Sequence, residues 1–171
     1  QGAELVDIEL APLMEYANCL KQVMAGEAYA WHKRFIDARP EDYGALGRER
    51  ILAGKGQTTA DYLAAMATRQ QLERAYLDSM KDVAAAVTIV ALNPPPRFDD
   101  HAGMKAAFGL EGRPPFTIVR APALAMPMGF TSTGLPMAIQ IVGRPREEAM
   151  VYRIAAAYER ATDWTTRKPP L

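Results

Sequence analysis

The chain has 171 residues, 49% of them apolar, and its 20 basic and 20 acidic side chains give a formal net charge of zero. This composition excludes disordered, collagen-like and disulfide-rich proteins, and the balanced charge disfavours nucleic acid or an anionic membrane as a partner. No apolar run approaches the roughly 20 residues of a membrane span, and no signal peptide is recognisable. The single cysteine, Cys19, favours a reducing compartment, so we expect a cytoplasmic protein. Because the chain starts at Gln1 rather than Met, we also expect it to be a piece of something longer.

The first half of the chain predicts one strand and three helices. Residues 3–10 mix apolar and acidic side chains, which predicts a strand that Pro12 closes. Residues 13–38 predict a helix whose apolar stripe consists of Leu13, Ala17, Leu20, Met24, Ala28, Trp31 and Phe35. A shorter helix is expected over residues 43–53. A capped helix follows over residues 60–79, with one face near Leu63, Met66, Ala67 and Gln70.

The second half predicts three strands and a closing helix. The apolar run 83–92 ends at three consecutive prolines, which indicates a buried strand followed by a rigid loop. Between residues 94 and 122 we expect only a helical turn near residues 104–108. Residues 123–130 and 137–142 predict a hairpin, and residues 147–162 predict the last helix. The chain shows no repeat or linker, so we expect one α/β unit over residues 1–171, with long helices covering an inner sheet.

The residues themselves supply no credible catalytic set. Ser79 and Ser132, the two serines, lack the glycine-rich elbow that exposes a nucleophile, so capping or turn roles are expected. His32 is expected to pack or to form a surface hydrogen bond, and the run 99–101 (Asp-Asp-His) is expected to be a solvated loop. Cys19 is expected to be an inert thiol. We predict no metal site, no nucleotide-binding loop and no cofactor.

One stretch carries a specific motif. Residues 122–145 read PALAMPMGFTSTGLPMAIQIVGRP. This run resembles the pattern P-A-x-x-x-P-x-G-F-x-x-x-G-L-P-x-x-x-Q-x-x-G in the carboxyl-terminal half of the amidase signature family. Weaker matches in the family's order are Glu27-Ala28 with His32, residues 50–54, Tyr62, Ala65 and Arg69, the run from Asp82, and residues 164–170. The resemblance implies a partial amidase-signature fold, with a mixed β-sheet covered by long helices.

The resemblance also implies where the chemistry of such an enzyme lies. Family enzymes hydrolyse amides with a Ser-Ser-Lys set, which sits in a glycine- and serine-rich segment of the amino-terminal half. Neither serine of this chain and none of its six lysines matches those positions. We therefore expect a carboxyl-terminal fragment that is inactive alone. Its expected partner is the amino-terminal half, or else a second copy of itself, and the intact parent would act on a small amide. The alternatives are a non-catalytic subunit or interaction module, or a relative of the tRNA-dependent amidotransferase A subunits.

The chain departs from the family's pattern at two places, and one arginine is a candidate substrate-binding residue. Arg120 stands where family members commonly have glycine, which matters if that backbone needs a positive φ. Residues 29–33 (YAWHK) replace a Ser-Ser-Asn-Leu-Ala stretch of the tRNA-dependent amidotransferase A subunits, which argues against that branch. Arg50 falls where those subunits hold a substrate carboxylate, and an arginine fork suits that task. A plain salt bridge is the other reading of Arg50.

Overall fold

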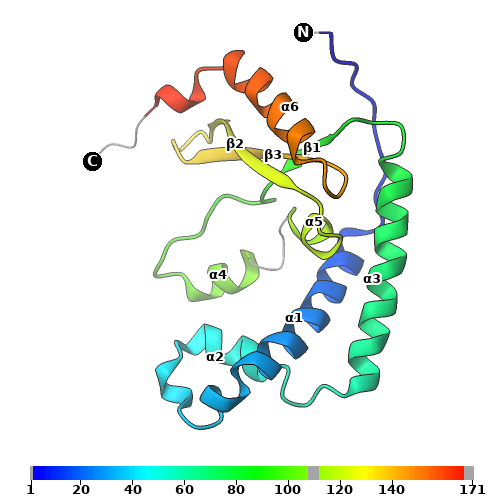
Figure 1. Cartoon of the computed structure of the whole chain (residues 1–171). Coiled ribbons are helices and arrows are strands. Elements are labelled where there is room, and N and C mark those ends of the chain that lie inside the picture. The colour runs from blue at the N-terminus through cyan, green and yellow to red at the C-terminus, as the bar shows by residue number, and fades with distance from the viewer. Residues whose placement is uncertain (1, 108–111, 168–171) are drawn as a thin grey trace.

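The computed structural model describes residues 2–107 and 112–167. Its elements follow the chain as helices and strands of an α/β fold (Figure 1). They are α1 (Leu13–Ile36), α2 (Ala45–Leu52), α3 (Thr59–Ser79), β1 (Ala86–Ile89), α4 (His101–Ala107), α5 (Pro114–Ile118), β2 (Ala123–Phe130), β3 (Pro136–Val142) and α6 (Glu148–Arg160), with 3₁₀ turns at Pro40–Asp42 and Trp164–Thr166. The expected α/β class and all the long helices are confirmed.

The strands form a sheet in the order β1-β3-β2, and both pairings are antiparallel. The predicted hairpin of β2 and β3 is confirmed, with a turn in which Gly134 has a φ of +85°. The register shifts between Pro127 and Gly129, as expected of a β-bulge at a proline and a glycine with φ +144°. The strand predicted over residues 83–92 is shorter than expected, since only Ala86–Ile89 pairs with β3.

Helix α6 covers one face of the sheet (Figure 1). Val151 and Ala155 of α6 pack against Met126 and Ile141 of the hairpin, and these four side chains are buried. The Tyr158 hydroxyl donates a hydrogen bond of 3.2 Å to the carbonyl of Pro127, at the bulge. The opposite face of the sheet is turned toward α5 and α4, with α5 meeting it at the end where Val142 lies.

The main core lies where the amino-terminal half of α1 meets α3 and α5. Its buried members are Tyr16, Cys19, Val23, Ala65, Leu72, Tyr76, Met80, Phe116, Ile118, Val119 and Val142. Two polar contacts tie α3 into this core. The Arg69 Nε donates to the carbonyl of Ile118 at 2.8 Å, and the Tyr76 hydroxyl donates to the carbonyl of Gly143 at 2.8 Å. Helix α3 therefore fixes both α5 and the end of β3.

The predicted amino-terminal strand is wrong. Residues 2–10 are extended but pair with no strand of the described chain. Instead the segment runs beside α3 (Figure 1), where Ile8 and Leu10 pack on the core and the Ser79 hydroxyl donates to the carbonyl of Glu9 at 2.5 Å. An alternating pattern needs a neighbouring strand to form a ladder, and α3 takes that place here.

The helices bury other faces than their apolar stripes suggest. In α1 the buried residues near the core are Tyr16, Cys19 and Val23, a face rotated by roughly 100° from the predicted stripe. The far part of that stripe is exposed: Met24 by 55%, Trp31 by 81% and Phe35 by 49%. We call these three residues the outer face of α1. In α3 the buried residues are Ala65, Leu72 and Tyr76, whereas Leu63 is 60% exposed.

Candidate functional site

The two serines and the cysteine lie in structural positions, as predicted. Ser79 ends α3, and its hydroxyl is engaged with the Glu9 carbonyl. Ser132 is exposed in the hairpin turn. Cys19 is buried, its thiol lies 3.4 Å from the carbonyl oxygen of Ala65, and burial raises the pKa of the thiol. A raised pKa leaves less thiolate at neutral pH, so this cysteine is a poor nucleophile.

His32 and the two aspartates of the Asp-Asp-His run also have structural partners. His32 Nδ1 lies 3.0 Å from the Tyr43 hydroxyl, with the two rings edge to face, so it packs α1 against the following loop. Asp99 pairs with Arg97 at 2.9 Å, and Asp100 accepts the backbone N–H of Gly103 at 2.8 Å. Within residues 2–107 and 112–167, no three His, Cys, Asp or Glu side chains cluster in a way that could hold a metal ion.

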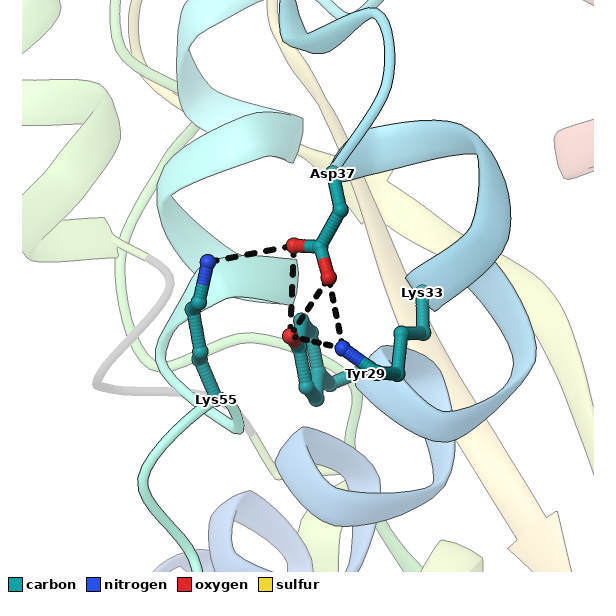
Figure 2. Close-up of polar contacts among 4 residues, drawn as sticks. All are labelled: Tyr29, Lys33, Asp37 and Lys55. Carbon is teal, nitrogen blue, oxygen red and sulfur yellow. Dashed lines mark hydrogen bonds and ion pairs between the residues drawn. The ribbon is translucent and has the colours of Figure 1, made fainter.

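A network of four polar side chains joins the end of α1 to the loop after α2 (Figure 2). Asp37 accepts hydrogen bonds from Lys33 at 2.6 Å and from Lys55 at 3.1 Å, and the Tyr29 hydroxyl donates to both of its oxygens. Hydrogen bonds from the two ammonium groups lower the pKa of Asp37 to about 2, and the carboxylate raises the pKa of Lys33 to about 12. Two ammonium groups thus share one carboxylate, and the network ties the end of α1 to the loop after α2.

Arg50 lies in the last turn of α2 and is solvent-exposed. Its position is fixed by the close approach of α2 to α1, where a Cβ on Gly54 would collide with the carbonyl group of Ala25. Glycine is therefore required at position 54 for the two backbones to touch. The role predicted for Arg50, binding a substrate carboxylate, stays a prediction.

A cavity of about 270 Å³ opens on the sheet face that α5 partly covers. It is lined by Val90, Arg113, Phe116, Thr117, Ala121, Ala123, Ala125 and Gln140, and we call it the Gln140 cavity. Gln140 is only 4% exposed and stands opposite Ala125 in the register of β2 and β3. It is the one buried polar side chain in the part of the chain that the structure describes.

Gln140 holds the wall of this cavity together. Its Nε2 donates to the carbonyl of Ile89 at 3.1 Å and to the carbonyl of Gly112 at 2.9 Å. Gly112 in turn donates its N–H to the carbonyl of Val90 at 2.9 Å, and a Cβ at Gly112 would collide with the Ile89 oxygen. One side chain on β3 therefore pins the end of β1 to the residue that leads into α5. This glutamine belongs to the motif of residues 122–145, where nothing local predicts its contacts, and its signal in the sequence is that of a lone polar residue in an apolar strand.

Arg120 borders the same region and adopts a φ of +57°. This is the left-handed conformation that glycine takes freely and that costs other residues about 1–2 kcal/mol. The expectation that a positive φ could be needed where Arg120 replaces glycine is confirmed.

Helix α2, which carries Arg50, and helix α5, which borders the Gln140 cavity, lie toward opposite ends of α1 (Figure 1). The cavity adjoins α5, which contacts the amino-terminal half of α1, whereas α2 packs at the other end. A helix of 24 residues is about 36 Å long. The structure therefore does not join the two into one site within this chain.

The described helices include none that is both long and apolar enough to traverse a lipid bilayer.

The known proteins that this chain resembles are longer than the chain, and it matches only part of each. The Amidase family model matches residues 1–152. The A-type subunit of a glutamyl-tRNA(Gln) amidotransferase from Chloroflexus aggregans is 32% identical, over all of this chain and 40% of the relative, and an amidase from Pseudomonas putida is 31% identical over 99% and 38%.

Solved structures show the same fold. A crystal structure of an amidase superimposes with a TM-score of 0.79 at 24% identity, covering 94% of this chain and 38% of that one. The urea amidolyase of K. lactis superimposes with a TM-score of 0.80 at 23% identity, covering 92% of this chain and 10% of that one. The chain thus spans about 40% of the length of the curated relatives named above, and the matched region belongs to larger proteins.

Proposed function

The chain belongs to the amidase signature family, and on this premise we propose that it forms the carboxyl-terminal part of one amidase-signature domain in a serine-dependent amidase. The parent enzyme would hydrolyse the C–N bond of a small amide. The observation that carries this proposal is the family match over residues 1–152, combined with coverage of only 38–40% of the relatives. A single cysteine, buried and unpaired, supports a reducing cytoplasmic setting.

This part of the enzyme is inactive alone in our proposal. Amide hydrolysis needs a nucleophile, a base within hydrogen-bond reach of it, and donors for the oxyanion. The Ser79 hydroxyl is engaged with a backbone carbonyl, and Ser132 lies in an exposed turn. Lys33 and Lys55 are both engaged with Asp37. In the parent enzyme the chain would instead contribute part of the β-sheet, the helices that cover it and one wall of the substrate pocket.

Arg50 is proposed as a substrate-binding residue that holds a carboxylate of the substrate. Arg50 is exposed at the end of α2, and the packing of Gly54 against the Ala25 carbonyl holds this end of the helix in place, which supports such a role. The amidotransferases among the relatives make that branch the alternative parent. The substrate class would separate the two, because only the amidotransferase acts on a tRNA-linked acceptor.

The outer face of α1 supports the proposal that this chain binds a protein partner. Trp31, Phe35 and Met24 form an exposed apolar stripe, and such stripes mark contact surfaces. We propose that this stripe contacts the amino-terminal part of the same enzyme, and the alternative is that it contacts a second copy of the chain. If the chain is instead an interaction module, the same surface would bind its partner.

The test of the catalytic proposal is turnover by the chain alone. The purified 171-residue polypeptide is assayed for ammonia release from a panel of small primary amides, and its purity is verified by denaturing intact-mass analysis. We expect no release above the buffer blank and no labelling by a serine-directed fluorophosphonate. Turnover that is abolished by Ser79→Ala or Ser132→Ala would overturn the proposal.

The partner proposal is tested by solution size and dye binding. We expect the chain to associate or to bind an apolar dye, and we expect Trp31→Gln with Phe35→Gln to reduce both. Tyr152→Gln on α6 is the matched control, since Tyr152 is 66% exposed outside this stripe. A clean monomer at high concentration without dye binding would contradict the assignment.

A further inference from the structure

A row of side chains follows α1 along its whole length. Its members recur at alternating steps of three and four residues, and we call this row the α1 seam: Met14, Ala17, Lys21, Met24, Ala28, Trp31 and Phe35. Alternating steps of three and four residues are the spacing by which two helices pack side by side in a coiled coil. The partner that this spacing fits is therefore another helix.

The large side chains of the α1 seam face solvent. Met14 is 55% exposed, and it extends the outer face of α1, whose three side chains are exposed by about half or more. Helices α3 and α5 pack on another side of α1, where Tyr16 and Cys19 are buried. None of the elements that the structure describes therefore covers these large side chains.

A second copy of α1 fits the seam in an antiparallel orientation. Turning a helix end over end reverses its steps of three and four, and two registers then keep the two seams in step over most of their length. In the first register the facing pairs, with one residue from each copy, are Ala17 with Phe35, Met24 with Ala28 and Lys21 with Trp31. Each alanine meets a large apolar side chain, which fills the layer. The ammonium group of Lys21 meets the indole ring of Trp31, whose face attracts a cation.

The other pairings match the side chains poorly. In the second antiparallel register the facing pairs are Met14 with Trp31, Ala17 with Ala28 and Lys21 with Met24. Large side chains then meet large ones and alanine meets alanine, so the helices cannot pack evenly along the seam. Parallel pairing sets each residue against its own copy, so the two Lys21 ammonium groups would repel each other within the seam.

We propose that two copies of the chain, in the absence of any other polypeptide, pair antiparallel through the α1 seam in the first register. Ala17 of each copy then packs against Phe35 of the other, and Lys21 of each copy lies against Trp31 of the other. The pairing rests on the contact role proposed above for the outer face of α1. It concerns the chain alone, since in the parent enzyme the amino-terminal part would take this face.

The test is sedimentation equilibrium of the whole chain and its variants over about 5–500 μM, which measures the Kd of the dimer. Ala17→Phe makes the seam more apolar but sets Phe against Phe35, so we expect the Kd to rise at least about tenfold. Phe35→Ala leaves a gap and should raise it similarly. The double variant restores one large and one small side chain to each layer, so its Kd should return to within about threefold of the starting value.

Controls separate this register from a merely adhesive surface. Ala149→Phe adds the same side chain to the exposed surface of α6 and should leave the Kd unchanged. Met24→Ala with Ala28→Met repeats the exchange in the neighbouring layer, and urea unfolding checks that each variant is folded.

Three results would overturn the inference. Tighter association of Ala17→Phe would show an unspecific apolar contact or a parallel pair. A double variant as weak as its single variants would show that Ala17 and Phe35 do not meet, and a monomer up to about 500 μM would show that the chain does not pair. Turnover by the chain alone would overturn only the proposed function.

Discussion

Two buried tyrosines offer a matched test of how hydrogen bonding stabilises this core. Tyr16 and Tyr76 belong to the same cluster, both are 0% exposed, and both differ from phenylalanine by one hydroxyl. The Tyr76 hydroxyl donates to the Gly143 carbonyl at 2.8 Å, whereas the Tyr16 hydroxyl donates to no acceptor among the described residues and has only the backbone N–H of Ala11 as a polar neighbour. The same substitution should therefore have unequal consequences at the two positions.

Tyr76→Phe removes the donor from a buried carbonyl and should lower the free energy of unfolding by about 1–3 kcal/mol. For a chain of this size each kcal/mol corresponds to about 2–4 °C in Tm, so we expect a fall of about 2–12 °C. Tyr16→Phe removes a hydroxyl that is desolvated and donates to no acceptor among the described residues, so the free energy of unfolding should change by less than about 1 kcal/mol.

The assay is urea unfolding of the three proteins, with the slope m compared to confirm that only stability has changed. The ring of Tyr76 keeps its edge-to-face contact with Phe116, with centroids 6.1 Å apart, in the phenylalanine variant. The measured difference therefore reports the hydroxyl rather than packing. Equal losses at the two positions would refute the reasoning, because they would show that the Gly143 hydrogen bond carries no specific stabilisation.

Three further predictions concern α1 and its neighbours. Gly54→Ala should destabilise the fold by about 1–3 kcal/mol in urea unfolding, because the new Cβ would collide with the Ala25 carbonyl. Gly47→Ala is the control: its new Cβ meets nothing within 4 Å, so it should stabilise α2 by about 0.5–1 kcal/mol. Asp37→Asn should lower Tm by a constant amount between about pH 5 and 9, and the difference should shrink as the pH falls from about 4 toward 2, since the pKa of Asp37 is lowered from 3.8 to about 2. Cys19 should react with a thiol reagent at about pH 8 at least about a hundredfold more slowly in the folded than in the unfolded chain, and equal rates would contradict its burial.

Local chemistry explains what the sequence predicted well. Gly134 and the Pro127–Gly129 bulge determine the hairpin through backbone conformations that few residues accept. The start of α3 was predictable because Thr58 and Asp61 form a reciprocal capping box, in which each side chain accepts the other's backbone N–H. Such signals depend only on residues a few positions apart.

Partners distant in the sequence explain what was missed. Helix α1 carries apolar residues on two faces, and only the placement of α3 and α5 decides that Tyr16 and Cys19 are buried while Trp31 is exposed. The segment before α1 alternates like a strand, but a ladder needs a second strand and the described chain supplies none there. The role of Gln140 depends on Gly112, 28 residues away, whose position no local pattern encodes.

The two apolar faces of α1 should respond differently to mutation, because one is buried in the core and the other is exposed. A deep mutational scan that scores the abundance of the isolated chain should tolerate polar residues at Trp31 and Phe35 and reject them at Tyr16 and Cys19. A scan that scores the output of the assembled enzyme should reject them at all four positions. The difference between the two maps would outline, residue by residue, the surface of this chain that the proposed amino-terminal part covers.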